Sequence, residues 1–585
     1  MNLAAEGLLP PPEHAKMPAS EIHLNRSRSF HSMIVRSDLG EQVKKAIESA
    51  QTASHLPAFD IPEVVIERPR ESGRGDYACP MAMQLARLAR MAPMKIAETI
   101  IEHIEAPDYV ETVELAPPGF INFKLTAAFL QQQVDDILAL GSRYGSFDRG
   151  VGKLAQVECV SANPTGPLSV ARGRGGVMGD TLARALEAAG YDVIREYYFN
   201  DAGRQMVLLG ESLKIRCQQL LGQNVELGPD HYQGDYLYWI AAVLIGTHGD
   251  DVIDEPVEFF TKQAKDTIIA SIQATLRRLK ITFDVYYNEH DLYTTGRVWQ
   301  ALDALKAKGY AYEEGGAQWF RSSALGDQED RVLVKSSGEP TYRMSDIAYH
   351  WHKAERGFDL VVDIFGADHH ATAPTVLMGV EALGYDPDFV HVLIHQFVTL
   401  IREGKQVRMS TRRGHFVTLD ELMDEVGPDA VRYFMLSRSG NSTIDFDMDL
   451  AVEQSDKNPV YYIQNAHVRC AGILRKWAES GLPQDGDEGA DLSLLDSGYE
   501  LNFLRKAVEL AEVLEFMVDE YEPHHIAFYA YELASLFHPT YENSRVLHSE
   551  VREPLRAARL RFYKAAKTLF AHVLNLMGMN APEVM

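Results

Sequence analysis

Gln156-Val157-Glu158-Cys159-Val160-Ser161-Ala162-Asn163-Pro164-Thr165-Gly166-Pro167 carries the strongest structural signal in the sequence. Its first four residues alternate polar and apolar side chains, and Val157 and Val160 are β-branched, which predicts a strand. The two prolines and the glycine that follow exclude both a longer strand and an early helix, so the chain has to turn. Apolar residues then recur at helical spacing from Met178 to Ala189, and Gly190 suits the end of that helix. The pattern is therefore strand, loop and helix.

This unit has the properties of a nucleotide-binding element. Between the prolines and the predicted helix lies the glycine-rich segment Arg172-Gly173-Arg174-Gly175-Gly176. In an open parallel sheet, backbone N–H groups and the positive end of a helix dipole then lie at the carboxyl end of a strand, where they favour phosphates. Because every strand-helix-strand unit needs a turn that contains glycine, a turn that binds no ligand is the alternative interpretation.

The segment Ser161-Ala-Asn-Pro-Thr-Gly-Pro-Leu168 resembles the loop before the H-I-G-H element of class I aminoacyl-tRNA synthetases, in the form found in arginyl-tRNA synthetases. The family expects His-Val-Gly-His where this chain has Ser169-Val170-Ala171-Arg172, so both imidazoles and the glycine are missing. The resemblance implies that Ser169 and Arg172 act in catalysis, next to the ATP phosphates.

Thr341 to Tyr349 resembles the segment that selects the amino acid in this family. A site for free arginine needs a carboxylate that pairs with the guanidinium group, and an aromatic wall adds contact to its planar face. Tyr342 and Asp346 provide both from one face of a helix; a surface tyrosine and a first-turn aspartate are the alternative. By resemblance, arginine also binds the residues Glu158, Ser161 and Asn163.

Two further segments resemble the ATP site of the family. Leu360 to Phe365 is a nearly continuous apolar run, typical of a buried parallel strand, and it ends in Gly366-Ala367-Asp368-His369-His370. Val407 to Gly414 resembles the K-M-S-K-S loop, with Arg408 as its first cation and Thr411 in place of its second lysine. The resemblance implies catalytic roles for Arg408 and Ser410. It implies ATP contacts for Gly366, Asp368, His369 and Met409.

ATP chemistry implies Mg²⁺ as a second cofactor. No protein residue is predicted to bind a metal, because the adjacent histidines 369 and 370 seldom converge on one ion. The four cysteines, Cys79, Cys159, Cys217 and Cys470, form no Cys-x-x-Cys pair and indicate neither zinc nor a disulfide framework.

Length predicts several domains, because single cores rarely exceed about 250–300 residues and this chain has 585. We expect a multidomain α/β protein, in which a small α/β N-terminal domain precedes a Rossmann-type parallel-sheet catalytic domain and an all-α C-terminal bundle. The predicted boundaries are 1–34 for a disordered extension, with a transit peptide as the alternative, and 35–145 for the N-terminal domain. They are 146–450 for the catalytic domain, with an insertion at about 206–324, and 451–585 for the bundle.

Composition restricts location and partners. No run of about 18 apolar residues is present, so no membrane span is expected, and the scattered cysteines favour the cytoplasm. The net charge of −26 argues against indiscriminate nucleic-acid binding, although a local basic surface is compatible with it. The basic segment Arg552 to Lys567 is a candidate tRNA contact or an ordinary solvated helix face.

The resemblance covers all but the first three dozen residues and implies an arginine–tRNA ligase. Such an enzyme uses ATP to form arginyl-adenylate from L-arginine and transfers the arginyl group to tRNA(Arg), usually as a monomer. Two alternatives remain. The altered residues 169–172 and Thr411 are compatible with a catalytically impaired paralogue that binds tRNA or acts as a regulator. A paralogue that activates arginine for another carrier ranks below both, because the tRNA-binding ends of the family are present.

Overall fold

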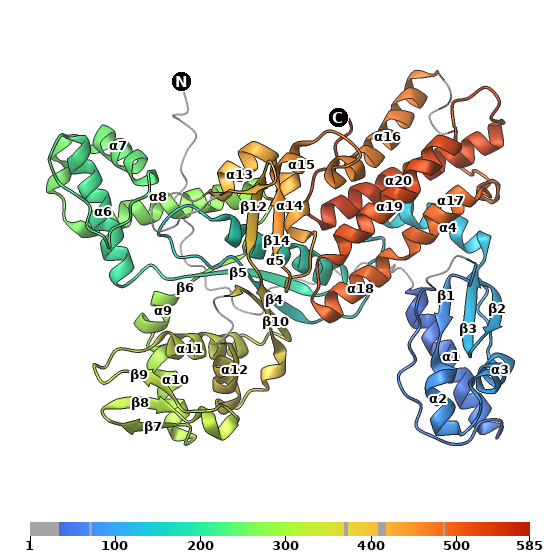
Figure 1. The fold of residues 1–585 in the computed structure, drawn as a ribbon, viewed down its shortest axis with the longest axis horizontal. Coiled ribbons are helices and arrows are strands. Elements are labelled where there is room, and N and C mark those ends of the chain that lie inside the picture. Colours follow the sequence, from blue (N-terminus) through green and yellow to red (C-terminus); the bar gives the residue numbers. More distant parts are fainter. Residues whose placement is uncertain (1–33, 70–72, 368–372, 408–416, 482, 484–485) are drawn as a thin grey trace.

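The computed structural model describes residues 34–585, except 70–72, 368–372, 408–416, 482 and 484–485. Its centre is a five-stranded parallel sheet in the order β11-β10-β4-β5-β6 (Figure 1). The strands are β4 (Leu154–Glu158), β5 (Asp192–Phe199), β6 (Val285–Asn288), β10 (Leu360–Gly366) and β11 (Val390–His395). The strand order changes direction between β4 and β10, and in open parallel sheets ligands bind at the carboxyl ends of the strands beside such a point.

Helix α5 (Val170–Ala188) follows β4 and packs on the sheet. It begins before the glycine-rich segment 172–176, so those glycines lie inside the helix, and the predicted loop is shorter than the sequence pattern indicates. The reason is close packing. A Cβ atom on Gly179 would lie 2.6 Å from Cys159 Sγ, and one on Gly173 would lie 2.7 Å from Leu419. Glycine therefore lets α5 approach its neighbours more closely than a larger residue would.

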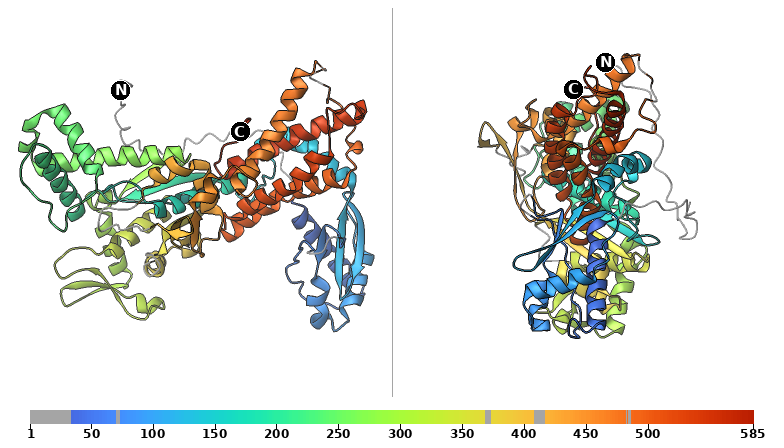
Figure 2. Two further views of the ribbon diagram at one scale, coloured as in Figure 1. Left: turned by 45° about the horizontal axis from the view of Figure 1, so that its top comes forward. Right: turned by 90° about the vertical axis from the view of Figure 1, so that its right-hand side faces the viewer.

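The segment predicted as an insertion at about 206–324 contains several helices and one strand of the central sheet. Helices α6 (Arg204–Leu220), α7 (Tyr236–His248) and α8 (Val257–Arg278) come first, at the end of the molecule far from the N-terminal unit (Figures 1 and 2). Strand β6 then joins the central sheet by pairing with β5, so residues 285–288 of this segment belong to the sheet. The helices before β6 masked its short strand pattern, which only pairing with β5 reveals.

A second helical and sheet layer follows β6. Helices α9 (Glu289–Thr294) and α10 (Arg297–Ala307) lead to an antiparallel sheet of β7 (Ala311–Glu314), β8 (Ala317–Phe320) and β9 (Arg331–Val334). Helix α11 (Tyr342–Glu355) returns the chain to β10, and α12 (Ala373–Ala382) precedes β11.

A smaller, three-stranded sheet follows the central sheet along the chain. Strands β12 (Val398–Arg402), β13 (Lys405–Gln406) and β14 (Ile444–Asp447) form it, with α13 (Leu419–Val426), α14 (Pro428–Leu436) and α15 (Met448–Val452) around them.

The two ends of the chain form an N-terminal unit and a helical bundle (Figure 2). The N-terminal unit contains α1 (Val35–Thr52), α2 (Met81–Ala89) and α3 (Pro93–His103) beside an antiparallel sheet of β1 (Tyr77–Cys79), β2 (Val110–Ala116) and β3 (Phe120–Leu125). The bundle contains α16 (Pro459–Glu479), α17 (Gly498–Val508), α18 (Leu510–Glu520), α19 (His525–Asn543) and α20 (Glu553–Leu576). Helix α4 (Ala127–Leu140) packs against α17 and α20. The fold class predicted from the sequence is confirmed.

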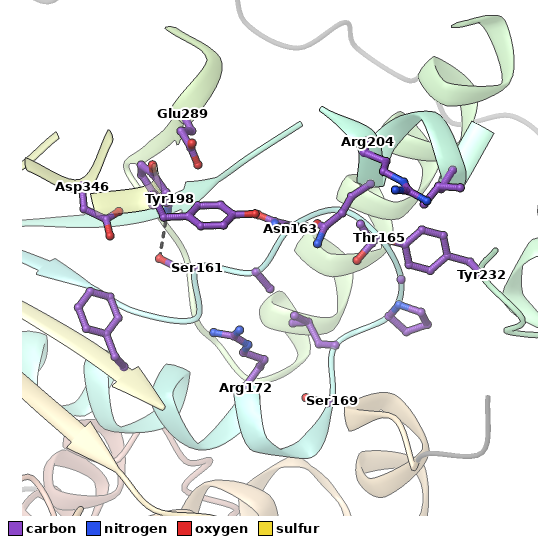
Figure 3. A pocket seen from close by; sticks show the side chains of 18 of the residues that line it. Ser161, Asn163, Thr165, Ser169, Arg172, Tyr198, Arg204, Tyr232, Glu289 and Asp346 are labelled. Carbon is purple, nitrogen blue, oxygen red and sulfur yellow. Dashed lines mark hydrogen bonds between the residues drawn. The ribbon is translucent and has the colours of Figure 1, made fainter. Parts of the chain in front are cut away.

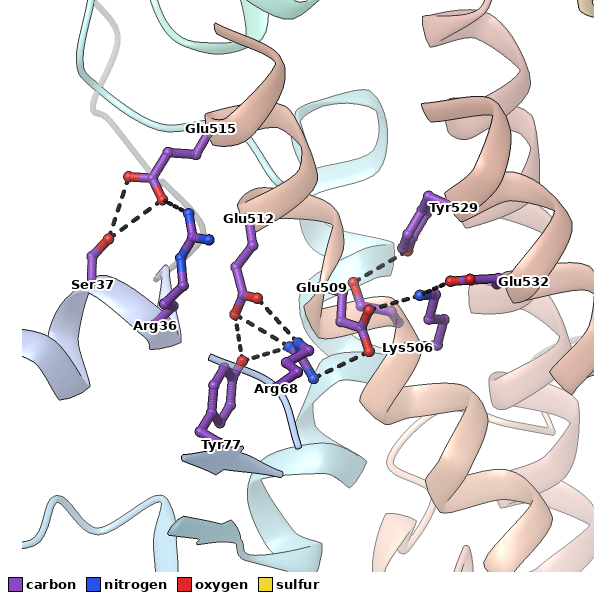
Figure 4. Close-up of polar contacts among 11 residues, drawn as sticks. Arg36, Ser37, Arg68, Tyr77, Lys506, Glu509, Glu512, Glu515, Tyr529 and Glu532 are labelled. Carbon is purple, nitrogen blue, oxygen red and sulfur yellow. Dashed lines mark hydrogen bonds and ion pairs between the residues drawn. The ribbon is translucent and has the colours of Figure 1, made fainter. Parts of the chain in front are cut away.

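Helix α18 joins these parts through carboxylates (Figure 4). Glu512 accepts hydrogen bonds from Arg68 Nε at 3.1 Å and from the hydroxyl group of Tyr77, both in the N-terminal unit. Glu515 pairs with Arg36 at 2.8 Å and with Arg149, which precedes β4, at 3.1 Å. Charge-assisted contacts of this kind are stronger than neutral hydrogen bonds, so they fix the N-terminal unit to the bundle.

The basic segment predicted as a candidate tRNA contact lies in α20. Its central cations form ion pairs with carboxylates of the same chain. Each of its five central cations pairs with a carboxylate. The pairs are Arg556–Glu553, Arg559–Glu500, Arg561–Asp135, Lys564–Asp487 and Lys567–Glu583. These pairs favour the interpretation of α20 as a packed and solvated helix.

Candidate active site

A cavity of about 1340 Å³ opens at the switch point of the central sheet (Figure 3). One side is formed by the carboxyl ends of β4 and β5, the starts of α5, α6, α9 and α11, and the segment before α7. Residues of β10, β11 and α12 form the other side. Sites for one small molecule usually measure about 300–1,000 Å³, so this cavity has room for two substrates side by side.

Seven of the predicted site residues line this cavity: Glu158, Ser161, Asn163, Ser169, Arg172, Tyr342 and Asp346. Gly366 is the last residue of β10. It is not among the residues that line the cavity, whereas the preceding residue, Phe365, is. The predictions for Asp368, His369, Arg408, Met409 and Ser410 lie outside the described residues. The tertiary structure thus brings the two groups of predicted residues, from β4–α5 and from α11, to one site.

The turn after β4 is strained. Val160 has φ = +68° and Ser161 has φ = +38°, values that a β-branched residue such as valine rarely adopts. Three contacts hold the turn: Ser161 Oγ donates to Glu158 at 2.8 Å, the amide of Tyr198 donates to Ser161 Oγ at 3.2 Å, and Arg172 Nη1 donates to the carbonyl of Val160 at 3.1 Å. Backbone strain of this kind concentrates at functional sites.

Two acidic side chains of the cavity, Asp346 and Glu289, form no ion pair with another residue that the structure describes. Burial is the main cause that raises the pKa of Asp346 to about 7; His350 opposes the shift, whereas Glu289 and Glu158 add to it. Burial also raises the pKa of Glu289. A buried carboxyl group whose pKa is raised gains most from a cationic ligand, because the ligand restores its ionised form. The pair therefore suits a substrate with a positively charged end.

Glu158 differs from these two residues because its carboxylate is already bonded within the protein. Oε2 accepts from Lys353 Nζ at 2.6 Å and from the Tyr349 hydroxyl group at 3.0 Å, while Oε1 accepts from Ser161. Glu158 is 2% exposed. It lies at the floor of the cavity, and its direct contact with arginine stays a prediction.

Tyr342 and Asn163 lie at the more open side of the cavity. Tyr342 is the first residue of α11 and is 77% exposed, so its ring is available to a ligand. Asn163 Oδ1 accepts from the amide of Asn200 at 2.9 Å and its Nδ2 donates to Gln205 at 3.3 Å, which ties the loop after β4 to the start of α6.

The sequence interpretation missed Glu289, because it treated the preceding segment as an insertion without chemistry. The available signal was the aromatic run Val285–Asn288, which ends in this acid as a strand of the sheet would. Tyr198, at the carboxyl end of β5, was also missed; its ring packs on Tyr349 with 4.5 Å between ring centroids.

Metal ligands are not gathered at the cavity in the part of the chain that the structure describes. Within that part, one group of potential ligands lies together, Glu522, His524 and His525 between α18 and α19. None of these three residues lines the cavity. No described helix is both long and apolar enough to cross a membrane.

Family models match the chain in three successive parts. They are described as the arginyl tRNA synthetase N terminal domain, at residues 37–125, the class I (R) tRNA synthetase catalytic domain, at 133–442, and the DALR anticodon binding domain, at 463–585.

Similar proteins extend over nearly the whole chain. The arginine–tRNA ligase of Salinibacter ruber is 43% identical over 549 residues, which are 90% of this chain and 97% of that protein. That of Desulfotalea psychrophila is 41% identical over 554 residues, 94% and 100% of the two chains. A putative arginyl-tRNA synthetase structure from Campylobacter jejuni has a TM-score of 0.73 and 31% identity, and covers 79% of this chain and 100% of its own. The Thermus thermophilus enzyme has the same fold, with a TM-score of 0.73, 23% identity and coverage of 94% and 100%.

The parallel sheet, the cavity at its switch point and the match of the catalytic-domain model define a class I aminoacyl-tRNA synthetase. Within this class, the chain belongs to the arginyl-tRNA synthetase family.

Proposed function

We propose that the cavity binds L-arginine and ATP side by side, and that the chain is an arginine–tRNA ligase. The pair of carboxyl groups on Asp346 and Glu289 is the observation that carries the proposal, because burial raises the pKa of both and a cationic ligand would favour their ionised forms. The guanidinium group of arginine provides that charge in a planar, bidentate form. Tyr342 covers one face of this group, and Ser161 and Asn163 orient the α-amino end.

ATP binds at the start of α5, beside Ser169, Arg172 and Gly366. Arg172 brings a permanent cation to the first turn, and Ser169 brings a hydroxyl donor, so together they hold the phosphates by charge and hydrogen bonds. These donors suit an anionic ligand, and the neighbouring cavity leaves room for it. A carboxylate oxygen of arginine then attacks the α-phosphorus, the bond to the bridging oxygen breaks, and pyrophosphate leaves. Mg²⁺, when bound with ATP, neutralises charge on the phosphate oxygens.

The arginyl group passes from the adenylate to the terminal ribose of tRNA(Arg). The N-terminal unit and the helical bundle, which match the N-terminal and anticodon-binding models, provide the remaining tRNA contacts. We place the enzyme in the cytoplasm as a monomer.

Arginine-dependent exchange of pyrophosphate into ATP, with and without tRNA, tests this function. We expect exchange with arginine and none with citrulline, a neutral molecule of nearly the same shape, because citrulline cannot neutralise the acid pair. Asp346→Asn should weaken exchange, whereas Asp303→Asn on the exposed face of α10 is the matched control. Equal exchange with citrulline would refute the assigned arginine site.

The altered motif at residues 169–172 favours one second candidate, an impaired paralogue that binds tRNA without activating arginine. This candidate predicts tRNA binding with no exchange under any condition. Exchange and filter binding of tRNA(Arg), measured on the same preparation, separate the two.

A further inference from the structure

A buried ionic cluster forms part of the floor of the cavity and extends beneath it. Lys353 in α11 is 0% exposed, and its Nζ lies 2.6 Å from Glu158 Oε2 and 2.6 Å from Asp363 Oδ1. His350 Nε2 lies 2.8 Å from the second oxygen of Asp363. Lys353 does not line the cavity, so it has no contact with a ligand there. It connects α11 with the two strands on either side of the switch point, β4 and β10.

The cluster keeps its charges because they compensate one another. Burial disfavours the charge of Lys353, but attraction by Asp363 and then by Glu158 outweighs burial and raises its pKa. Burial likewise opposes ionisation of Asp363, but Lys353, followed by His350, lowers its pKa to about 2. Other charged or titratable groups face the cluster from neighbouring elements. They are Glu196 of β5, Tyr349 and Asp346 of α11, and Arg356, which follows α11.

The cluster ends in the strained turn after β4. Glu158 uses one oxygen for Lys353 and the other for the hydroxyl group of Ser161, which has φ = +38°. A residue holds such a conformation only when its surroundings fix it. Lys353 therefore fixes Glu158, Glu158 fixes Ser161, and Ser161 presents the loop to the cavity.

We propose that Lys353 is a positioning residue for arginine, which acts through Glu158 and Ser161 to hold the strained turn in its binding conformation. This inference rests on the proposed function, because it takes arginine as the ligand of the cavity. It assigns Glu158 to the support of the site and leaves Asp346 and Glu289 as the acids that meet the guanidinium group.

Two matched substitutions separate positioning from general stability. Glu158→Gln and Asp363→Asn each remove one carboxylate from Lys353 by the same isosteric change, but only the first lies on the path to Ser161. Isothermal titration with arginine should show an affinity loss of tenfold or more for Glu158→Gln and of less than threefold for Asp363→Asn. Melting temperatures of both variants report their structural effect. Equal affinity losses in the two variants would overturn the proposal.

A double-mutant cycle provides a second readout. Lys353→Met leaves Glu158 without its cation, so the turn at Ser161 loses its support and arginine affinity should fall tenfold or more. Glu158→Gln combined with Lys353→Met should lose no more affinity than Glu158→Gln alone, because both changes break the same path. A further affinity loss in the double variant would show that Lys353 acts through another group and overturn the proposal.

These outcomes differ from a failure of the proposed function, in which the wild type binds no arginine at any pH. If Lys353→Met does not fold, the comparison of Glu158→Gln with Asp363→Asn decides the inference alone.

Discussion

At the scale of single residues, the acids of the cavity differ in whether another residue of the chain compensates their charge. Glu158 has its cation in Lys353 and its hydroxyl partner in Ser161. Asp346 and Glu289 have raised pKa values because burial disfavours their ionised forms. Under the proposed function, this difference gives the three acids separate roles, since an acid without an ion-pair partner gains more from binding a cation.

Arginine affinity should depend on pH through Asp346. The pKa of this carboxyl group is raised to about 7, so the group is protonated in part below pH 7 and ionised above it. Arginine stays cationic throughout this range, so its affinity should rise as the pH increases from 6 to 8. Calorimetry in buffers of different ionisation enthalpy should show proton release on binding at pH 7.

Asp346→Asn provides the control for this pH dependence. The variant should lose roughly 2–5 kcal/mol of arginine binding and the step near pH 7, because a desolvated charged contact is removed. An unchanged arginine affinity or pH profile would show that Asp346 is not part of the site.

Arg172 takes the place of a histidine that the family expects, and its loss should impair adenylate formation. Arg172→Ala removes both the cation at the start of α5 and the hydrogen bond to the Val160 carbonyl group. We expect the exchange rate to fall by about 10²–10³, the usual effect of losing one donor to developing charge. Arg172→Lys keeps the positive charge, so its exchange rate should fall less than that of Arg172→Ala. A wild-type rate in Arg172→Ala would contradict a role as the substitute donor.

At the scale of elements, glycines let α5 lie close to its neighbours, because a Cβ atom on Gly173 or Gly179 would come within 3 Å of them. The glycines of this helix made the segment 172–176 look like a loop in the sequence. Glycine has low helix propensity, but tertiary packing overrides that preference where a side chain has no room.

Gly179→Ala should therefore destabilise the protein, although alanine favours a helix. The new Cβ atom would lie 2.6 Å from Cys159 Sγ and 2.7 Å from its Cβ, so α5 or β4 has to shift. We expect a loss of about 1–3 kcal/mol in the free energy of unfolding, measured with urea. Gly246→Ala in α7 is the control, since nothing lies within 4 Å of its Cβ position, and it should gain up to about 1 kcal/mol. A stabilised Gly179→Ala would show that the close approach has room to relax.

At the scale of the whole molecule, α18 connects parts that are far apart in sequence. Its carboxylates meet arginines of the N-terminal unit and of the segment before β4, while the helix itself packs against α5 and α19 (Figure 4). The N-terminal unit therefore depends on the bundle for its position relative to the active site.

Glu512→Gln should weaken the docking of the N-terminal unit. The change removes the charge that Arg68 and Tyr77 share, in a contact that is mostly buried. Charged hydrogen bonds of this kind contribute about 1.5–3 kcal/mol, so amides of α1 and β1 should exchange hydrogen faster. Glu41→Gln, which breaks only an exposed pair with Lys44, should leave exchange unchanged. Equal protection in both variants would place the docking energy elsewhere.

Deletion of residues 1–33 should leave stability and aminoacylation nearly unchanged. The sequence there has no periodic apolar face to bury, and chain ends without such a face tolerate removal. Thermal unfolding and aminoacylation of tRNA(Arg) check this expectation. A large loss of either property would mean that the segment docks on the enzyme.

The sequence by itself determined the local units and the order in which they occur. Hydrophobic alternation before Glu158 and the apolar run Leu360 to Phe365 predict strands, because side-chain periodicity reports which faces are buried. The four-residue spacing of Tyr342 and Asp346 likewise places both side chains on one face of a helix, by helical geometry alone. The motifs could then be placed in a family despite the changes at Ser169 and Arg172.

Only the tertiary structure decided which charges are free and which are paired. The role of Glu289 depends on β6 joining β5, and the pairing of Glu158 with Lys353 joins residues 195 positions apart. The same holds for the cations of α20, which look like an exposed basic surface in sequence and form ion pairs in the fold. The physical reason is that charge compensation acts through space over a few ångströms, whereas sequence patterns report only local periodicity.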